Sequence, residues 1–214
     1  MERFTIQKND FLSHDCTGYF HLYYVGYGQP GNPDYLNTLK NIFVSTHPDT
    51  LRAASRQAAS LMIQDIPQVM EAEGLDTAIL MAVPRSKSGM CNWQLGFKAA
   101  VRTTVKALQA DNLSVIDGTD FIFRHTSTKM THLRKPVSNF ENTGSEPYPG
   151  ITKDTCDIQN ESIKGRTVIL IDDIYTKTVN VDEDCIQALY DAGVARVVFY
   201  AVAYTNRNAY RRGA

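Results

Sequence analysis

The spacing of apolar residues alternates along the chain between continuous runs and the period of three to four residues that is typical of a helix. Short runs rich in Val, Ile and Leu occupy residues 77–83, 167–171 and 196–204, and each run predicts one buried strand. Between them, apolar residues recur every three or four positions over 92–108 and 181–192, which predicts two amphipathic helices. Strands that alternate with helices in this way indicate an α/β fold with a central, mostly parallel sheet and helices on both faces.

Further elements are predicted before and between these segments. Residues 19–25 form a strand candidate near the N-terminus, and 113–116 and 121–123 form two shorter ones. Thr46–Asp49 reads as a capping box with a proline in the first turn, so we expect a helix to follow. That helix should end or kink at Pro67.

The predicted domain organisation is simple. The chain has 214 residues, 43% of them apolar, which is enough for one substantial domain. We expect residues 1–45 to form an N-terminal extension over one edge of the sheet and residues 46–214 to form the main domain. Residues 125–160 are irregular and rich in Pro and Gly, and loops of that length inside a compact domain are usually functional or disordered.

Composition and charge exclude several classes of protein. The 22 Lys and Arg balance 23 Asp and Glu, so bulk positive charge cannot hold this chain on nucleic acid. No apolar window is long enough to cross a membrane, and the first residues lack the features of a signal peptide. The four cysteines lie far apart without a CxxC pair, which argues against a disulfide framework and fits a reducing compartment. We therefore expect a cytoplasmic protein.

One glycine motif is better interpreted as a turn than as a nucleotide loop. Gly26–Gly31 matches GxGxxG, but Pro30 and Pro33 lie where the helix of a dinucleotide site should begin. Asn32–Asp34 is itself a typical turn sequence.

Polar residues follow two of the predicted strands. Pro84–Lys87 follows the strand at 77–83, and Asp172 and Asp173 are expected to end the strand at 167–171. Ligands bind at the carboxyl ends of strands in open α/β sheets. The sequence therefore predicts a site built from these two segments.

The segment from Val168 to Asn180 resembles the signature of the type I phosphoribosyltransferases. It contains an apolar strand, two acids, two apolar residues and then a threonine-containing loop. The closest likeness is to the amidophosphoribosyltransferase-like, competence-protein ComF branch, and it extends over about residues 77–205. Ala82–Arg85, followed by Trp93–Gly96, resembles the strand, pyrophosphate loop and helix of that branch. The resemblance implies a sheet of the phosphoribosyltransferase type and a Mg²⁺-dependent transfer from 5-phosphoribosyl-1-pyrophosphate (PRPP), or a related ribose phosphate, with release of pyrophosphate.

The resemblance also implies a role for each segment. Asp172 and Asp173 would contact the ribose hydroxyls, stabilise developing positive charge and hold Mg²⁺ indirectly. Residues 125–160 would form a hood that closes over the site. The 5′-phosphate would lie on Thr176, Lys177, Thr178, Val179 and Asn180, and the pyrophosphate on Pro84, Arg85, Ser86 and Lys87.

The chain departs from the family at the phosphate loop. The family has Thr-Thr-Gly-Ala-Thr where this chain has Thr-Lys-Thr-Val-Asn, so Thr178 stands where glycine normally allows a positive φ. Asp182, Glu183 and Asp184 follow in the first turn of the predicted helix, where they suit the helix dipole but repel a bound anion. These departures favour an alternative: a catalytically inactive protein of the same fold that senses a ligand or serves a protein partner.

A third interpretation concerns nucleic acid. Residues 121–140 carry several basic side chains, which can clamp pyrophosphate, contact a nucleic acid strand or simply face solvent. They are Arg124, His125, Lys129, His132, Arg134 and Lys135.

Overall fold

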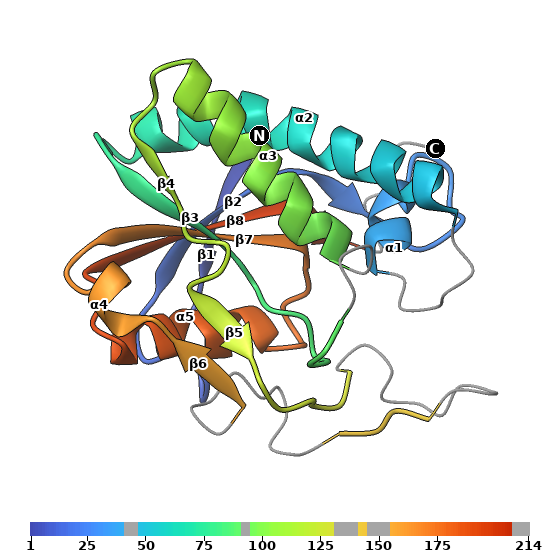
Figure 1. Ribbon diagram of the computed structural model, residues 1–214. Helices are drawn as coiled ribbons and strands as arrows, with labels where there is room; N and C mark the ends of the chain where they lie inside the picture. The colour runs from blue at the N-terminus through green and yellow to red at the C-terminus, as the bar shows by residue number, and fades with distance from the viewer. Residues whose placement is uncertain (41–46, 91–94, 131–140, 145–154, 207–214) are drawn as a thin grey trace.

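The computed structural model describes residues 1–40, 47–90, 95–130, 141–144 and 155–206 (Figure 1). Its strands are β1 (Glu2–Ile6), β2 (Cys16–Tyr24), β3 (Ala78–Ala82), β4 (Val115–Asp117), β5 (Ile122–Arg124), β6 (Cys156–Ile158), β7 (Thr167–Tyr175) and β8 (Arg196–Thr205). Its helices are α1 (Asp34–Lys40), α2 (Pro48–Ala72), α3 (Gly96–Ala110), α4 (Asn160–Ile163) and α5 (Val181–Asp191).

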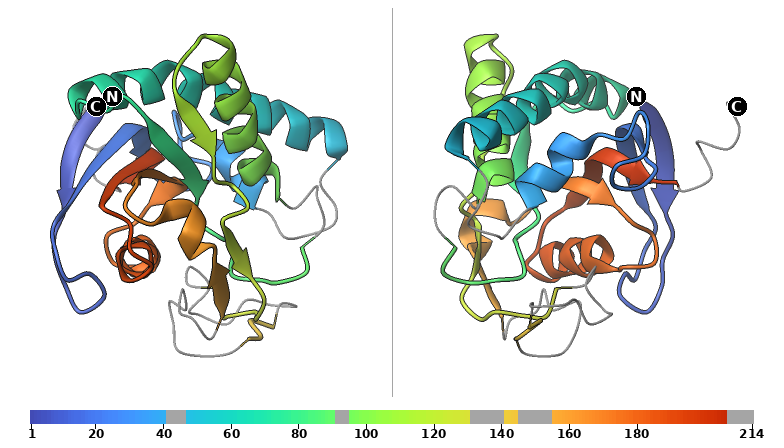
Figure 2. Two further views of the ribbon diagram at one scale, coloured as in Figure 1. Left: turned by 60° about the vertical axis from the view of Figure 1, so that its left-hand side comes forward. Right: turned by 90° about the vertical axis from the view of Figure 1, so that its right-hand side faces the viewer.

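Six of the strands form one sheet in the order β1-β2-β8-β7-β3-β4, while β5 and β6 form a separate antiparallel ribbon. Every pairing in the six-stranded sheet is parallel except that of β1 with β2. Helices α1, α2 and α3 cover one face and α5 covers the other (Figures 1 and 2). The predicted fold class, a mostly parallel sheet with helices on both faces, is confirmed.

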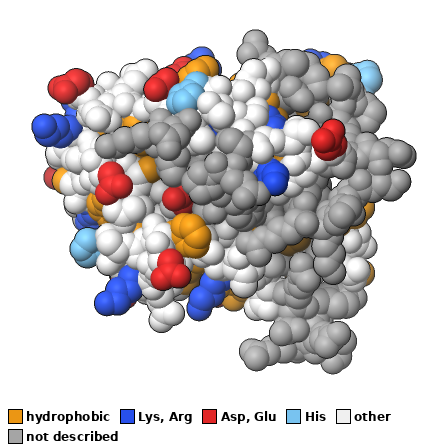
Figure 3. Space-filling model, turned by 90° about the horizontal axis from the view of Figure 1, so that it is seen from below, with side chains coloured by type: hydrophobic (Ala, Val, Ile, Leu, Met, Phe, Trp, Pro, Cys, Tyr) orange, Lys and Arg blue, Asp and Glu red, His pale blue; other side chains and the backbone are white. Residues whose placement is uncertain are grey.

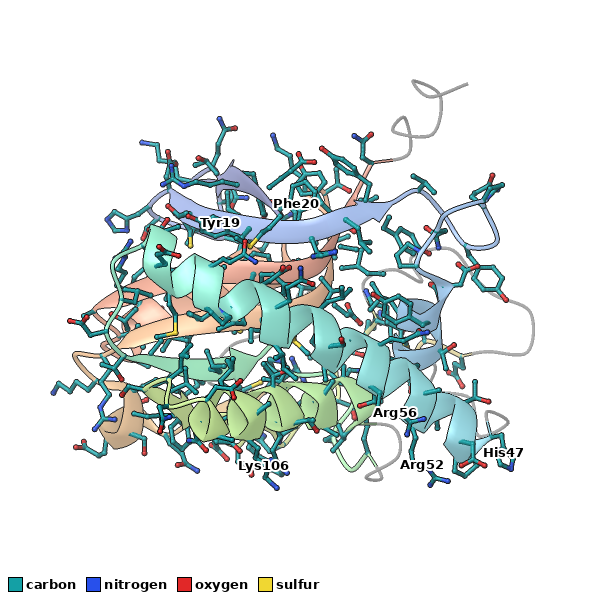
Figure 4. All side chains as sticks on the ribbon, turned by 90° about the horizontal axis from the view of Figure 1, so that it is seen from above. Tyr19, Phe20, His47, Arg52, Arg56 and Lys106 are labelled. Atoms are coloured by element: carbon teal, nitrogen blue, oxygen red, sulfur yellow. The ribbon has the colours of Figure 1, made fainter. Side chains whose placement is uncertain are left out.

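The sheet is buried on both faces because its central strands are apolar throughout. Ile169 and Ile171 of β7 belong to the core beneath α2 and α3, whereas Val168 and Leu170 belong to the core that α5 covers. In β2, Tyr19 and Phe20 likewise point to opposite faces (Figure 4). A strand between two helical layers needs no polar face, which explains the unbroken apolar runs.

Strand β7 does not end where the sequence suggested. It continues past Asp172 and Asp173 to Tyr175, because the neighbouring strand β8 is long enough to pair with it up to Tyr204. The prediction that the two acids end the strand was therefore wrong. Both carboxylates therefore project from a strand and not from a loop.

Helix α2 does not end at Pro67, which was one of the two outcomes that the sequence predicted. Pro67 lies inside the helix, which runs unbroken to Ala72, and Val69 and Met70 beyond it are buried. Packing of this last turn outweighs the hydrogen bond that the proline cannot donate. The N-cap is His47, whose ring accepts a hydrogen bond from the backbone of Asp49, while Thr46 lies outside the described residues. Figure 4 shows His47 at the start of this helix.

The N-terminal residues are part of the same sheet. Strands β1 and β2 extend it at one edge, and β2 pairs in parallel with β8. The GxGxxG segment forms turns, with the Gln29 amide donating to the Gly26 carbonyl, and α1 begins only at Asp34. The turn interpretation is confirmed. The boundary predicted at residue 45 falls in 41–46, outside the described residues.

The predicted hood is described in part. Residues 131–140 and 145–154 lie outside the described chain, as does Trp93. Strand β6, near the end of the stretch, pairs with β5 and so gives regular structure to a segment that the sequence indicated as irregular. The described cysteines, Cys16, Cys156 and Cys185, are buried free thiols. In the part of the chain that the structure describes, no helix is both long and apolar enough to span a membrane.

A buried polar contact joins α2 to the sheet and gives a test of the fold. Asp65, 1% exposed, accepts hydrogen bonds at 2.8 Å from Tyr200 Oη and from His21 Nδ1. Asp65→Ala should lower the free energy of unfolding by about 2–4 kcal/mol in urea titrations, because the buried Tyr200 hydroxyl loses its acceptor. Gln64→Ala, an exposed change on the same helix, should stay within about 0.5 kcal/mol of wild type. Equal stability of the two variants would contradict this description of the core.

Candidate functional site

The carboxyl ends of β3 and β7 meet, as the sequence predicted. The Val83 amide donates to the Ile171 carbonyl at 2.9 Å, which brings the segment after β3 beside the two acids of β7. A cavity of about 120 Å³ opens there. It is lined by Asp172, Asp173 and Asp182, by Lys40, Arg85 and Arg124, and by Val83, Pro84, Ser86, Met130, Ile174, Thr176, Val179 and Val181.

Asp173 is held in place by an ion pair with the N-terminal part of the chain. Its Oδ1 accepts from Lys40 Nζ at 2.9 Å and from the Ile174 amide at 2.7 Å, and the residue is only 3% exposed. Lys40 is the last residue of α1, so this pair fixes the end of that helix against β7. The two acids raise the pKa of Lys40, although burial acts in the opposite direction.

Asp172 is paired differently, with another acid. Burial, followed by the charge of Asp173, raises the pKa of Asp172 to about 7. A hydrogen bond joins it to Asp182 of α5, and burial together with Asp172 raises the pKa of Asp182 well above its ordinary value. Both carboxyls thus bind a proton more tightly than a free acid does, and the two titrate as a pair.

The cations of the cavity come from three separate elements. Lys40 belongs to α1, Arg85 to the segment after β3, and Arg124 to β5. Arg85 donates to the backbone carbonyls of Leu39 and Lys40, and Arg124 Nε donates to the Arg85 carbonyl. Backbone carbonyls thus help to position two guanidinium groups at the cavity, and Arg85 interacts there with the charges of Asp172 and Asp173.

The predicted pyrophosphate loop lies only partly in this cavity. Pro84, Arg85 and Ser86 line it, but Lys87 lines a neighbouring cavity instead. Lys87 Nζ donates to the carbonyl of Thr128 at 2.9 Å and to that of Thr143. Arg124, which the sequence placed in a basic run, stands in the cavity where Lys87 was expected.

Only part of the predicted phosphate loop, residues 176–180, lies at the cavity. Thr176 and Val179 line the cavity, whereas Lys177 and Thr178 are exposed and do not. The left-handed conformation that we expected at the position of Thr178 occurs at Asn180, with a φ of 60°, and asparagine tolerates it better than a β-branched residue. Asn180 lies outside the cavity lining, and its side-chain oxygen accepts from Asn9 at 3.3 Å.

The acids at the start of α5 are not a solvated cap. Asp182 and Glu183 are buried, at 4% and 1% exposure, and Tyr175 Oη donates to Glu183 at 2.8 Å. Tyr175 packs against the rings of Phe4 and Phe199. It is therefore a core aromatic residue.

The basic run does not form an exposed strip in the described part of the chain. Arg124 is buried, and His132, Arg134 and Lys135 lie outside the described residues. Acidic and basic side chains are interspersed over the described surface seen from below (Figure 3). The described residues therefore give the nucleic-acid interpretation no particular support.

A Mg²⁺ ion fits this site only together with a ligand. The Lys40 ammonium already occupies one oxygen of Asp173, and Asp172 shares a hydrogen bond with Asp182. Asp172 is thus the carboxylate best placed to reach a metal, directly or through water. The remaining oxygens of an octahedral Mg²⁺ would have to come from water and from a bound phosphate.

Sequence reasoning found some of these residues and missed others. It selected Asp172, Asp173 and Arg85 and noted the acids of the α5 turn, but nothing distinguished Lys40 from any other helix-terminal lysine. Its place in the cavity depends on how α1 packs against α2, a tertiary contact that has no local sequence signal.

Comparison with known proteins adds little to this geometry. No family model matches the chain, and a search of curated proteins finds no match. Among solved structures, the chain is similar to the allosteric regulatory enzyme of purine biosynthesis, with 12% identity and a TM-score of 0.36 over 79% of this chain and 29% of that one. The chain spans less than a third of that protein's length. A likeness this weak is no evidence of activity and does not single out the ComF branch.

The raised pKa of Asp172 gives a test of the acid cluster. A carboxyl that binds its proton more tightly in the fold stabilises the fold below its unfolded pKa, near 3.8, and loses that contribution as the pH rises to about 7. The free energy of unfolding of Asp172→Asn minus that of wild type should therefore increase as the pH rises from about 3.8 to about 7, and it should stay constant at higher pH.

Urea titrations at a series of pH values measure this difference. Asp120→Asn is the control, because ion pairing with Lys98 lowers the pKa of Asp120 and its difference should not grow over the same interval. A pH-independent difference for Asp172→Asn would contradict the acid pairing described above.

Proposed function

We propose that the cavity binds a ribose carrying a diphosphate at its anomeric carbon and that the chain transfers the ribosyl group to an acceptor, releasing pyrophosphate. The observation that carries the proposal is the meeting of three carboxyl groups and three cations in one cavity at the carboxyl ends of β3 and β7. PRPP, which the sequence resemblance implies, is the accessible member of this substrate class.

The carboxylates of β7 are suited to binding the hydroxyl groups of the ribose. Ribose offers vicinal hydroxyl donors, and the Asp172 carboxylate is an acceptor that reaches the cavity from rigid strand backbone. As the bond to the diphosphate breaks, positive charge develops at the anomeric carbon, and the negative charge of Asp172 and Asp173 stabilises it. Neither residue has to reorient, because each is already fixed by its own partner.

The cations of the cavity are suited to binding the diphosphate, which is the leaving group. Arg85 and Arg124 present guanidinium groups that bind phosphate oxygens in a fixed fork, and Lys40 adds a compact positive charge. Mg²⁺, if bound with the diphosphate, would supply further charge neutralisation of the leaving group. The segment after β3 therefore holds the diphosphate while β7 holds the ribose.

A second function is favoured by one contact. The Lys40–Asp173 ion pair already satisfies a carboxylate that the family uses for ribose hydroxyls. This ion pair can stay intact in a protein that binds the ligand without turning it over, such as a sensor or the partner of another protein. Pyrophosphate binding without pyrophosphate release from PRPP, over a range of amine acceptors, would favour this second function.

The catalytic proposal predicts the behaviour of a double variant. Asp172→Asn with Asp173→Asn should reduce pyrophosphate release from PRPP by about a thousandfold or more, because the negative charge opposite the anomeric carbon is lost. Circular dichroism should show that the variant is folded, and calorimetry should show that it still binds pyrophosphate through the cations. Wild-type activity in the double variant would contradict the proposal.

A further inference from the structure

The neighbouring cavity that Lys87 lines has no part in the proposed function. Its volume is about 190 Å³. It shares Val83, Pro84, Arg85 and Arg124 with the first cavity, whereas most of its other lining residues come from the segment after β3, the start of α3 and strand β5. The two cavities are therefore adjacent but are lined mostly by different residues.

An exposed aromatic side chain forms part of the wall of the neighbouring cavity. Phe123 of β5 lines this cavity and is 59% exposed, whereas Phe97 and Ile122, which also line it, are buried in the core. Met90 and Leu95 add further apolar surface. A planar ring that packs on Phe123 gains both buried apolar area and stacking. The wall is thus suited to an aromatic ligand.

All the charged side chains that the structure describes on this wall are basic. They are Arg85, Lys87, Lys98 and Arg124. Lys98 forms an ion pair of 2.6 Å with Asp120, but Lys87 Nζ donates to the neutral carbonyls of Thr128 and Thr143. Burial and the charge of Arg124 lower the pKa of Lys87, so this ammonium group lies in a positive field. A cavity lined by charges of one sign attracts a ligand of the opposite sign, here an anion.

The uncharged polar side chains of the wall are already hydrogen-bonded to other parts of the protein. The Ser88 hydroxyl shares a hydrogen bond of 3.0 Å with that of Ser127, and Thr119 Oγ1 donates to Asp117 Oδ1 at 2.6 Å. A ligand therefore gains little from these two hydroxyls. An apolar cavity of about 150 Å³ holds one benzene ring, so this larger cavity has room for a single ring with a small substituent.

We infer that the neighbouring cavity is a second ligand site, which binds a single aromatic ring that carries an anionic group such as a carboxylate. The ring packs on Phe123 and the apolar part of the wall, and the basic side chains attract the anionic group. This inference goes beyond the proposed function, which depends on the first cavity.

Calorimetry on the full chain with benzoate and benzyl alcohol tests the inference. Wild type should bind benzoate with a Kd of about 0.1 mM, and benzyl alcohol at least about tenfold more weakly because it lacks the charge. Phe123→Ala should bind benzoate at least about tenfold more weakly than wild type does. Tyr27→Ala is the matched control, since it removes an exposed ring that lines neither cavity, and it should bind benzoate as wild type does.

Three results would overturn the inference. They are an absence of benzoate binding to wild type, equal affinity of wild type for the two probes, and equal benzoate affinity in wild type and Phe123→Ala. Circular dichroism and an unchanged unfolding midpoint should show that Phe123→Ala is folded, because the side chain it shortens is mostly exposed.

Pyrophosphate separates this inference from the proposed function. Because Arg85 and Arg124 line both cavities, saturating pyrophosphate should weaken benzoate binding by at most about tenfold and then have no further effect. Weakening that continues to increase with pyrophosphate concentration would place benzoate in the first cavity, which overturns the inference and leaves the proposed function standing. If wild type binds benzoate but not pyrophosphate, the proposed function fails, and the comparison with Phe123→Ala still decides the second site.

Discussion

The ion pair between Lys40 and Asp173 is the contact on which the arrangement of the site depends. The Asp173 carboxylate is buried, its Oδ1 lies 2.9 Å from Lys40 Nζ, and the pair joins the end of α1 to β7 near the carboxyl end of that strand. Breaking such a pair leaves an uncompensated buried charge, so the end of α1 and the strand must keep their relative positions. Arg85 reinforces the contact by donating to the carbonyls of Leu39 and Lys40, which brings a second cation to the same place.

Two acids adjacent in sequence therefore have different chemical environments. Asp173 meets a cation from α1, whereas Asp172 meets a second acid, Asp182, from α5. The difference arises from the alternation of side chains along a strand covered by helices on both faces. It gives the cavity one fixed carboxylate and one that titrates near neutral pH, with all the cations arriving from other elements. This separation of charge is the physical basis of the proposed ribosyl diphosphate site.

Much of the fold could be predicted from the sequence because short stretches of residues specify its helices and strands. The apolar run at 167–171 and the helical spacing at 181–192 identify their elements within a few residues. Strand β7 was predicted too short because its length depends on pairing with β8. Asp172, Asp173 and Arg85 were found because each follows an apolar run closely, whereas Lys40 was not, since its role depends on long-range packing. The burial of Asp182 was equally hidden, because acids in a first helical turn are ordinarily exposed.

The central claim, that the cavity beside β7 binds a diphosphate through cations from separate elements, can be tested by pyrophosphate calorimetry on wild type and Lys40→Met. The claim predicts micromolar binding to wild type and at least about tenfold weaker binding to Lys40→Met, because a methionine of similar length carries no charge. Lys106→Met, which removes an exposed cation on α3 (Figure 4), should bind as wild type does. Equal affinity in wild type and Lys40→Met, or no binding to wild type, would contradict the claim.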